Sequence, residues 1–93
     1  MDQEFQNKLS EWRNERYPNS DEIDIALKLG EEVGEVLGAV FKYEWNVTTN
    51  RDNIREEIGD AGLTLASLCQ YNGWDFNEVL RDRAIQKGMI DGS

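Results

Sequence analysis

The stretch IALKLGEEVGEVLGAVFKY, residues 25–43, decides the fold class. Its apolar residues recur every three or four positions as far as about Tyr43, which predicts one long amphipathic helix. These residues are Ile25, Leu29, Val33, Val36, Leu37 and Val40. Asn19 followed by Glu22 matches a capping box, so we expect this helix to begin close to Asn19.

The same helical period continues on both sides of this stretch. Phe5, Leu9 and Trp12 predict a first helix that ends before Pro18. After a polar connector at 46–50, a third helix is expected to end near 72–73. Its apolar face is Ile54, Ile58, Ala61, Leu65, Leu68 and Cys69.

A fourth helix is predicted near the end of the chain. Asp75 and Glu78 form a second capping-box pattern ahead of Val79, Leu80 and Ile85, and Gly88 ends the helix. We therefore predict an all-α fold, a small bundle of about four helices in a single domain of residues 1–93. A core this small favours completion of the bundle by dimer or tetramer assembly.

Composition excludes several classes of function. The net charge of −9 argues against a nucleic-acid polymer as partner, because such proteins present a basic surface. The absence of histidine removes imidazole bases, histidine metal sites and serine–histidine triads. A single cysteine, no secretory leader and no long apolar run indicate a cytoplasmic protein without a membrane span. Carboxylates must therefore carry any chemistry.

Glycines occupy unusual places in the two central helices. Gly30, Gly34 and Gly38 fall on one line of the second helix, and Gly59 and Gly62 lie on the third. Each interior glycine destabilises a helix by roughly 1 kcal/mol relative to alanine. We expect the line to allow close packing of another helix or a ligand, although glycines on an exposed face are the simpler alternative.

The acidic residues of these helices carry the chemical signal. Glu32 and Glu35 are three residues apart, as are Glu57 and Asp60, so each pair shares a helix surface. Glu32 and Glu57 border the apolar faces, where two packed helices would meet. If the helices are antiparallel, the pairs converge, and their repulsion opposes ionisation unless a divalent cation binds.

Magnesium suits such a site, because it takes oxygen ligands and keeps positions open for substrate phosphates. It can also polarise a phosphate and lower the pKa of water. The alternative is that these acids simply form solvated helix faces, since glutamate is a good helix former.

The motifs 31–35, EEVGE, and 57–60, EIGD, resemble the paired EExxE and ExxD motifs of the MazG-like, all-α nucleoside triphosphate pyrophosphohydrolases. The similarity extends over roughly residues 5–87, from the lead-in at 12–18 to the segments 72–75 and 78–80. It implies that Glu32, Glu35, Glu57 and Asp60 coordinate Mg²⁺, with Mn²⁺ as a possible substitute. It also implies a homodimer or homotetramer that hydrolyses triphosphates to monophosphate and pyrophosphate, in nucleotide-pool house-cleaning.

Glu31 matches the first glutamate of the motif and is assigned a supporting catalytic role, either ordering water or acting as general base. Relatives often carry an Asn and then basic residues on or after the last helix. This chain has no Asn in that stretch, but Arg83 and Lys87 are candidate phosphate contacts. Lys28 is a third. Ordinary surface cations, or an intrahelical Lys–Glu pair for Lys28, explain them equally well.

Trp12 and Trp45 are candidate contacts for the base, because aromatic faces stack on bases with little discrimination. Packing in a core or a subunit interface is the more common role of such residues.

Two further functions stay open. The same fold and metal can serve a phosphoribosyl-nucleotide or a nucleoside diphosphate, or the chain can be a non-catalytic acidic interaction module.

Overall fold

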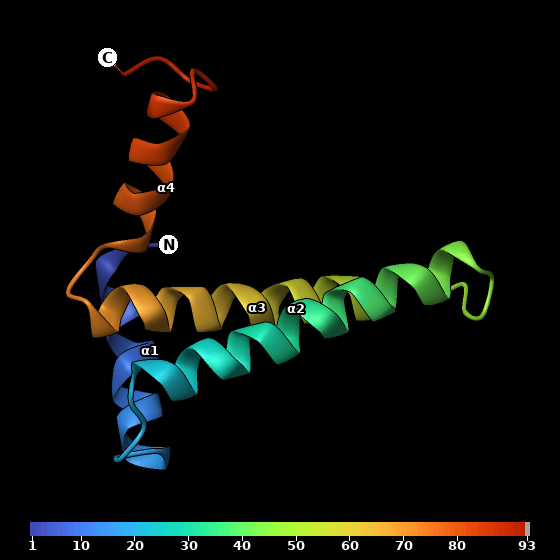
Figure 1. Cartoon of the computed structure of the whole chain (residues 1–93), viewed down its shortest axis with the longest axis horizontal. Coiled ribbons are helices and arrows are strands. Elements are labelled where there is room, and N and C mark those ends of the chain that lie inside the picture. Colours follow the sequence, from blue (N-terminus) through green and yellow to red (C-terminus); the bar gives the residue numbers. More distant parts are fainter. Residues whose placement is uncertain (93) are drawn as a thin grey trace.

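The computed structural model describes residues 1–92, which form four α-helices and no strand. The helices are α1 (Gln3–Arg16), α2 (Glu22–Glu44), α3 (Asp52–Tyr71) and α4 (Phe76–Gln86). Figure 1 shows α2 and α3 as a long antiparallel hairpin, with α1 crossing the end where α2 begins and α3 finishes. From that same end, α4 extends away from the hairpin. The predicted all-α fold is confirmed.

The predicted helix ends are close to those observed, with one error. Helix α2 is capped by Asp21, whose side chain accepts from the Asp24 backbone N–H at 3.0 Å, with Asp24 reciprocating. The prediction of an Asn19–Glu22 box is therefore wrong. Tyr17 O accepts from the Ser20 N–H, which places Asn19 inside a turn and delays the helix by two residues.

Helix α4 begins as predicted. The side chain of Asp75 accepts from the Glu78 N–H at 3.0 Å. Gly73 has a φ of +74°, a left-handed conformation that glycine adopts without steric strain, and it turns the chain between α3 and Asp75.

The buried core is thin and built largely from small side chains. Ile25, Ala39, Ala66 and Cys69 are its buried apolar residues in the described part of the chain. Several members of the expected apolar faces remain more than half exposed, namely Val33, Leu37 and Ile58. The α2–α3 hairpin therefore leaves much apolar surface uncovered by its own chain.

No helix in the described part of this chain packs closely against the glycine line. A Cβ placed on Gly30, Gly34 or Gly38 would meet no atom within 4 Å, and Gly59 and Gly62 are equally open. The face of α2 that meets α3 contains Ile25, and at about 100° per residue the glycine line lies roughly on the opposite side. The glycines are therefore open within this chain, and packing of a ligand or of a helix from another copy against them stays a prediction.

A buried glutamine joins α1 to the rest of the molecule. Gln6 is 1% exposed, and its Nε2 donates to Gln70 Oε1 and to the Trp74 carbonyl, each at 2.8 Å. Its Oε1 accepts from the Phe76 N–H at 2.9 Å, at the start of α4. The side chain therefore ties α1 to α3 and to the turn before α4, while Phe5, expected to pack, is 47% exposed.

None of the described helices has the length and apolarity that a membrane crossing needs.

Candidate metal and nucleotide site

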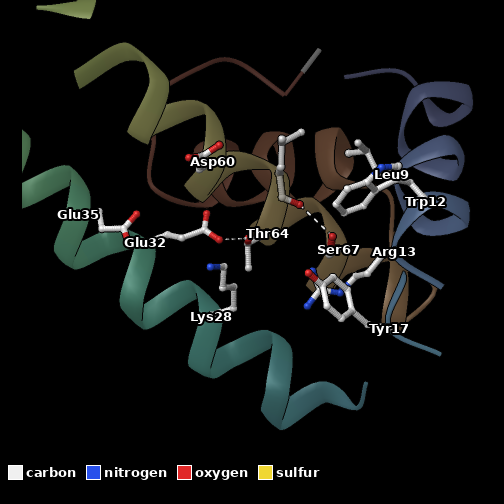
Figure 2. Close-up of a pocket in the computed structure, with 11 residues that line it drawn as sticks. Leu9, Trp12, Arg13, Tyr17, Lys28, Glu32, Glu35, Asp60, Thr64 and Ser67 are labelled. Carbon is white, nitrogen blue, oxygen red and sulfur yellow. Dashed lines mark hydrogen bonds between the residues drawn. The ribbon is translucent and has the colours of Figure 1, made fainter. Parts of the chain in front are cut away.

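The four acids predicted as metal ligands come in two pairs, Glu32 and Glu35 on α2 and Glu57 and Asp60 on α3. Figure 2 shows three of them, Glu32, Glu35 and Asp60, on the facing helices. Glu32 is 5% exposed, although a carboxylate normally points into water. Glu57 is half-buried, and Glu35 and Asp60 are more exposed. One acid of each pair is therefore held at the helix–helix contact, as the sequence pattern predicts.

Thr64 fixes the position of Glu32. Its hydroxyl donates to Glu32 Oε1 at 2.9 Å, and both side chains are buried. The threonine follows Asp60 by one turn of α3, so the bond links the two helices within the acidic site. Hydrogen bonds to a charged group are stronger than neutral ones, so the pair holds one carboxylate oxygen in place.

Glu57 and Glu35 interact directly across the hairpin. Hydrogen bonding with the Glu35 side chain, followed by desolvation and then repulsion from Glu35, Asp60 and Glu56, raises the pKa of Glu57 above its ordinary value of 4.5. The crowded acids thus make the Glu57 carboxyl group easier to protonate, which is the response of acids forced together.

The carboxylate oxygens of these acids are suitable ligands for a hard divalent cation. Glu32 Oε2 and Glu57 Oε2 are buried and have no hydrogen-bond partner. Such oxygens are destabilising when left unsatisfied, and they are the ligands that Mg²⁺ takes. Within residues 1–92, no three acidic side chains yet form a coordination cluster. Binding by all four acids would require their side chains to turn toward one another.

A cavity of about 310 Å³ adjoins the acids, between α1 and the hairpin (Figure 2). Its lining consists of Leu9, Trp12, Arg13 and Tyr17 from α1 and its end, Lys28, Glu32 and Glu35 from α2, and Asp60, Leu63, Thr64 and Ser67 from α3. Three of the four predicted ligands thus open into a space whose far wall carries an aromatic ring and a guanidinium.

Of the other predicted residues, Lys28 and Trp12 line the cavity. Glu31 does not, since it is exposed and its Oε1 lies 3.7 Å from Lys28 Nζ. Trp45 is 70% exposed and lies at the C-terminal end of α2, away from the cavity. Its ring stacks on the Phe41 ring, with the two ring centroids 4.9 Å apart.

Arg83 and Lys87 lie on α4 and at its end, outside the cavity of this chain. Arg83 donates to Gln86 Oε1 at 3.1 Å. The contributions of Arg13, Thr64 and Ser67 were not anticipated. A hydroxyl one turn after Asp60 on an otherwise apolar face is the signal that would have identified Thr64.

The profile of the MazG nucleotide pyrophosphohydrolase domain matches residues 21–88, from the cap of α2 to the end of α4. The chain belongs to the MazG family. This MazG domain is therefore all-α and belongs to a family of nucleotide pyrophosphohydrolases. The match begins at Asp21, after α1, and does not cover the α1 wall of the cavity. Searches of curated proteins and of solved structures returned no significant match.

Proposed function

We propose that this MazG domain hydrolyses nucleoside triphosphates, deoxynucleotides included, to a monophosphate and pyrophosphate with Mg²⁺. The observation that carries the proposal is the pair of buried, unpartnered oxygens on Glu32 and Glu57, next to Glu35 and Asp60. A magnesium ion held by these four acids would neutralise phosphate charge and activate water.

In the reaction, a water oxygen forms a bond to the α-phosphorus. The bond from that phosphorus to the oxygen bridging to the β-phosphorus breaks, and pyrophosphate leaves with the electron pair. Glu31, which does not line the cavity but has its Oε1 3.7 Å from Lys28 Nζ, is the proposed acceptor of the water proton or the group that orders the water. Lys28 lies on the cavity wall, where its charge faces the phosphates.

The nucleoside is proposed to contact Trp12, whose ring is 51% exposed on the α1 wall. We also propose that a second copy completes the bundle as a homodimer or homotetramer. The uncovered apolar residues of α2 and α3, among them Val33, Leu37 and Ile58, support this assembly, since burying them against a second copy would remove apolar surface from water. Arg83, Lys87 and Trp45 would then reach a substrate only in a neighbouring copy's site.

The test is product analysis with a panel of ribo- and deoxyribonucleoside triphosphates, with and without Mg²⁺. We expect pyrophosphate and a monophosphate only when Mg²⁺ is supplied. Glu32→Gln and Asp60→Asn should abolish turnover while the helical circular dichroism stays unchanged. Release of inorganic phosphate instead would place cleavage at the terminal phosphate and refute the proposed reaction.

Glu44→Gln is the matched control. Glu44 is exposed at the end of the same helix as Glu32, and its substitution makes the same change in net charge. It should keep wild-type turnover. Equal loss in Glu44→Gln and Glu32→Gln would show that overall charge, and not the acidic site, sets the rate. Absence of turnover with every triphosphate would favour a binding module.

A further inference from the structure

The α1 wall of the cavity contains a cation without an anionic partner. Arg13 lines the cavity, and its Nε is buried with no hydrogen-bond partner. Within residues 1–92 its guanidinium forms no ion pair, and its nearest aromatic contact is the Tyr17 ring, with the centroid 5.9 Å from Cζ. Burial of Nε without a hydrogen-bond partner is destabilising, and the rest of the side chain is half-buried, so this position is suited to an anionic ligand that accepts from the guanidinium.

The charges around the cavity limit what that ligand can be. The protein carries a net charge of −9, and Glu32, Glu35 and Asp60 face the same space. Lys28, the other cation of the lining, already lies 3.7 Å from Glu31. Figure 2 shows the carboxylates on the α2 and α3 side and Arg13 on the α1 side. Arg13 is therefore the cavity cation that still lacks an anion.

We propose that Arg13 forms an anion subsite for the two terminal phosphates of the triphosphate, the part that leaves as pyrophosphate. This inference rests on the proposed function, which puts the α-phosphorus at the acidic site. The planar guanidinium matches two phosphate oxygens at once, whereas a base carbonyl would leave its charge uncompensated.

Direct binding tests the subsite independently of turnover. Isothermal titration calorimetry with inorganic pyrophosphate in the presence of Mg²⁺ should show Arg13→Gln binding roughly 10- to 100-fold more weakly than wild type. Arg13→Lys should fall between them, because lysine keeps the charge but loses the two-point geometry. Lys8→Gln is the control, since Lys8 is an exposed α1 cation whose Nζ lies 3.5 Å from Glu4. It should bind like wild type.

Steady-state kinetics separate a phosphate contact from a base contact. Arg13→Gln should raise KM by a similar factor for all four deoxynucleoside triphosphates. A rise confined to one base, with pyrophosphate binding unchanged, would overturn the proposal. Equal pyrophosphate affinity in wild type, Arg13→Gln and Arg13→Lys would also overturn it. If Arg13→Gln fails to fold by circular dichroism, Arg13→Lys decides. If wild type binds pyrophosphate through Arg13 but cleaves no triphosphate, the proposed function fails and the subsite stands.

Discussion

Substitution of Gln6 by leucine should destabilise the protein more than any exposed substitution on α1. The change keeps the approximate volume but removes three hydrogen bonds, two at 2.8 Å and one at 2.9 Å. It leaves the Trp74 carbonyl and the Phe76 N–H without their side-chain partner in a part-buried position. Each such orphaned group is destabilising by about 1–3 kcal/mol. We expect a total loss of about 3 kcal/mol, which lowers Tm by roughly 12–24 °C for a domain of this size.

Urea unfolding followed by far-UV circular dichroism, at several protein concentrations, measures this loss. Concentration must be varied because assembly would add to the apparent stability. Gln3→Leu is the control, since Gln3 is exposed and its bond to Gln70 is long, at 3.4 Å. It should change the free energy of unfolding by less than about 0.5 kcal/mol. If Gln6→Leu is as stable as Gln3→Leu, Gln6 does not hold α1 to α3 and α4.

Two further predictions concern the acidic site. Thr64→Val, which removes the hydroxyl that donates to Glu32, should weaken Mn²⁺ binding about 10-fold, and Thr64→Ser should restore it. Because Thr64→Val also leaves the buried Glu32 without this hydrogen bond, it should destabilise the metal-free protein by about 1–3 kcal/mol. Titration followed by electron paramagnetic resonance measures the Mn²⁺ affinities, and equal affinity in Thr64→Val and wild type would refute the role. The raised pKa of Glu57 means that, above its ordinary value of 4.5, the folded protein binds more protons than the unfolded chain. The metal-free protein should therefore lose stability as pH rises from about 4.5 through the raised pKa, and Glu57→Gln should lack this component. Thermal melts of metal-free wild type and Glu57→Gln at several pH values test this prediction. The same dependence of Tm on pH in both proteins would contradict it.

The sequence predicts local structure well because helix formation here depends on neighbouring residues. Apolar spacing and Asp75 located the helices, and the i, i+3 acids marked the face where α2 meets α3. The cavity could not be predicted, because it depends on which side of α1 crosses the hairpin. Apolar spacing favoured Phe5 on the packed side of α1, whereas Gln6 is buried since it can satisfy three polar groups of α3 and the following turn. The hydrogen bond from Thr64 to Glu32 likewise depends on the relative register of α2 and α3.

The central claim is that Glu32, Glu35, Glu57 and Asp60 together hold a divalent cation that contacts the triphosphate. Anomalous diffraction from crystals grown with Mn²⁺ and a non-hydrolysable triphosphate analogue tests it directly. We expect an anomalous peak within about 2.0–2.3 Å of oxygens from these side chains and from the phosphates. A peak bound elsewhere, or these four carboxylates directed into bulk solvent with nucleotide present, would contradict the account.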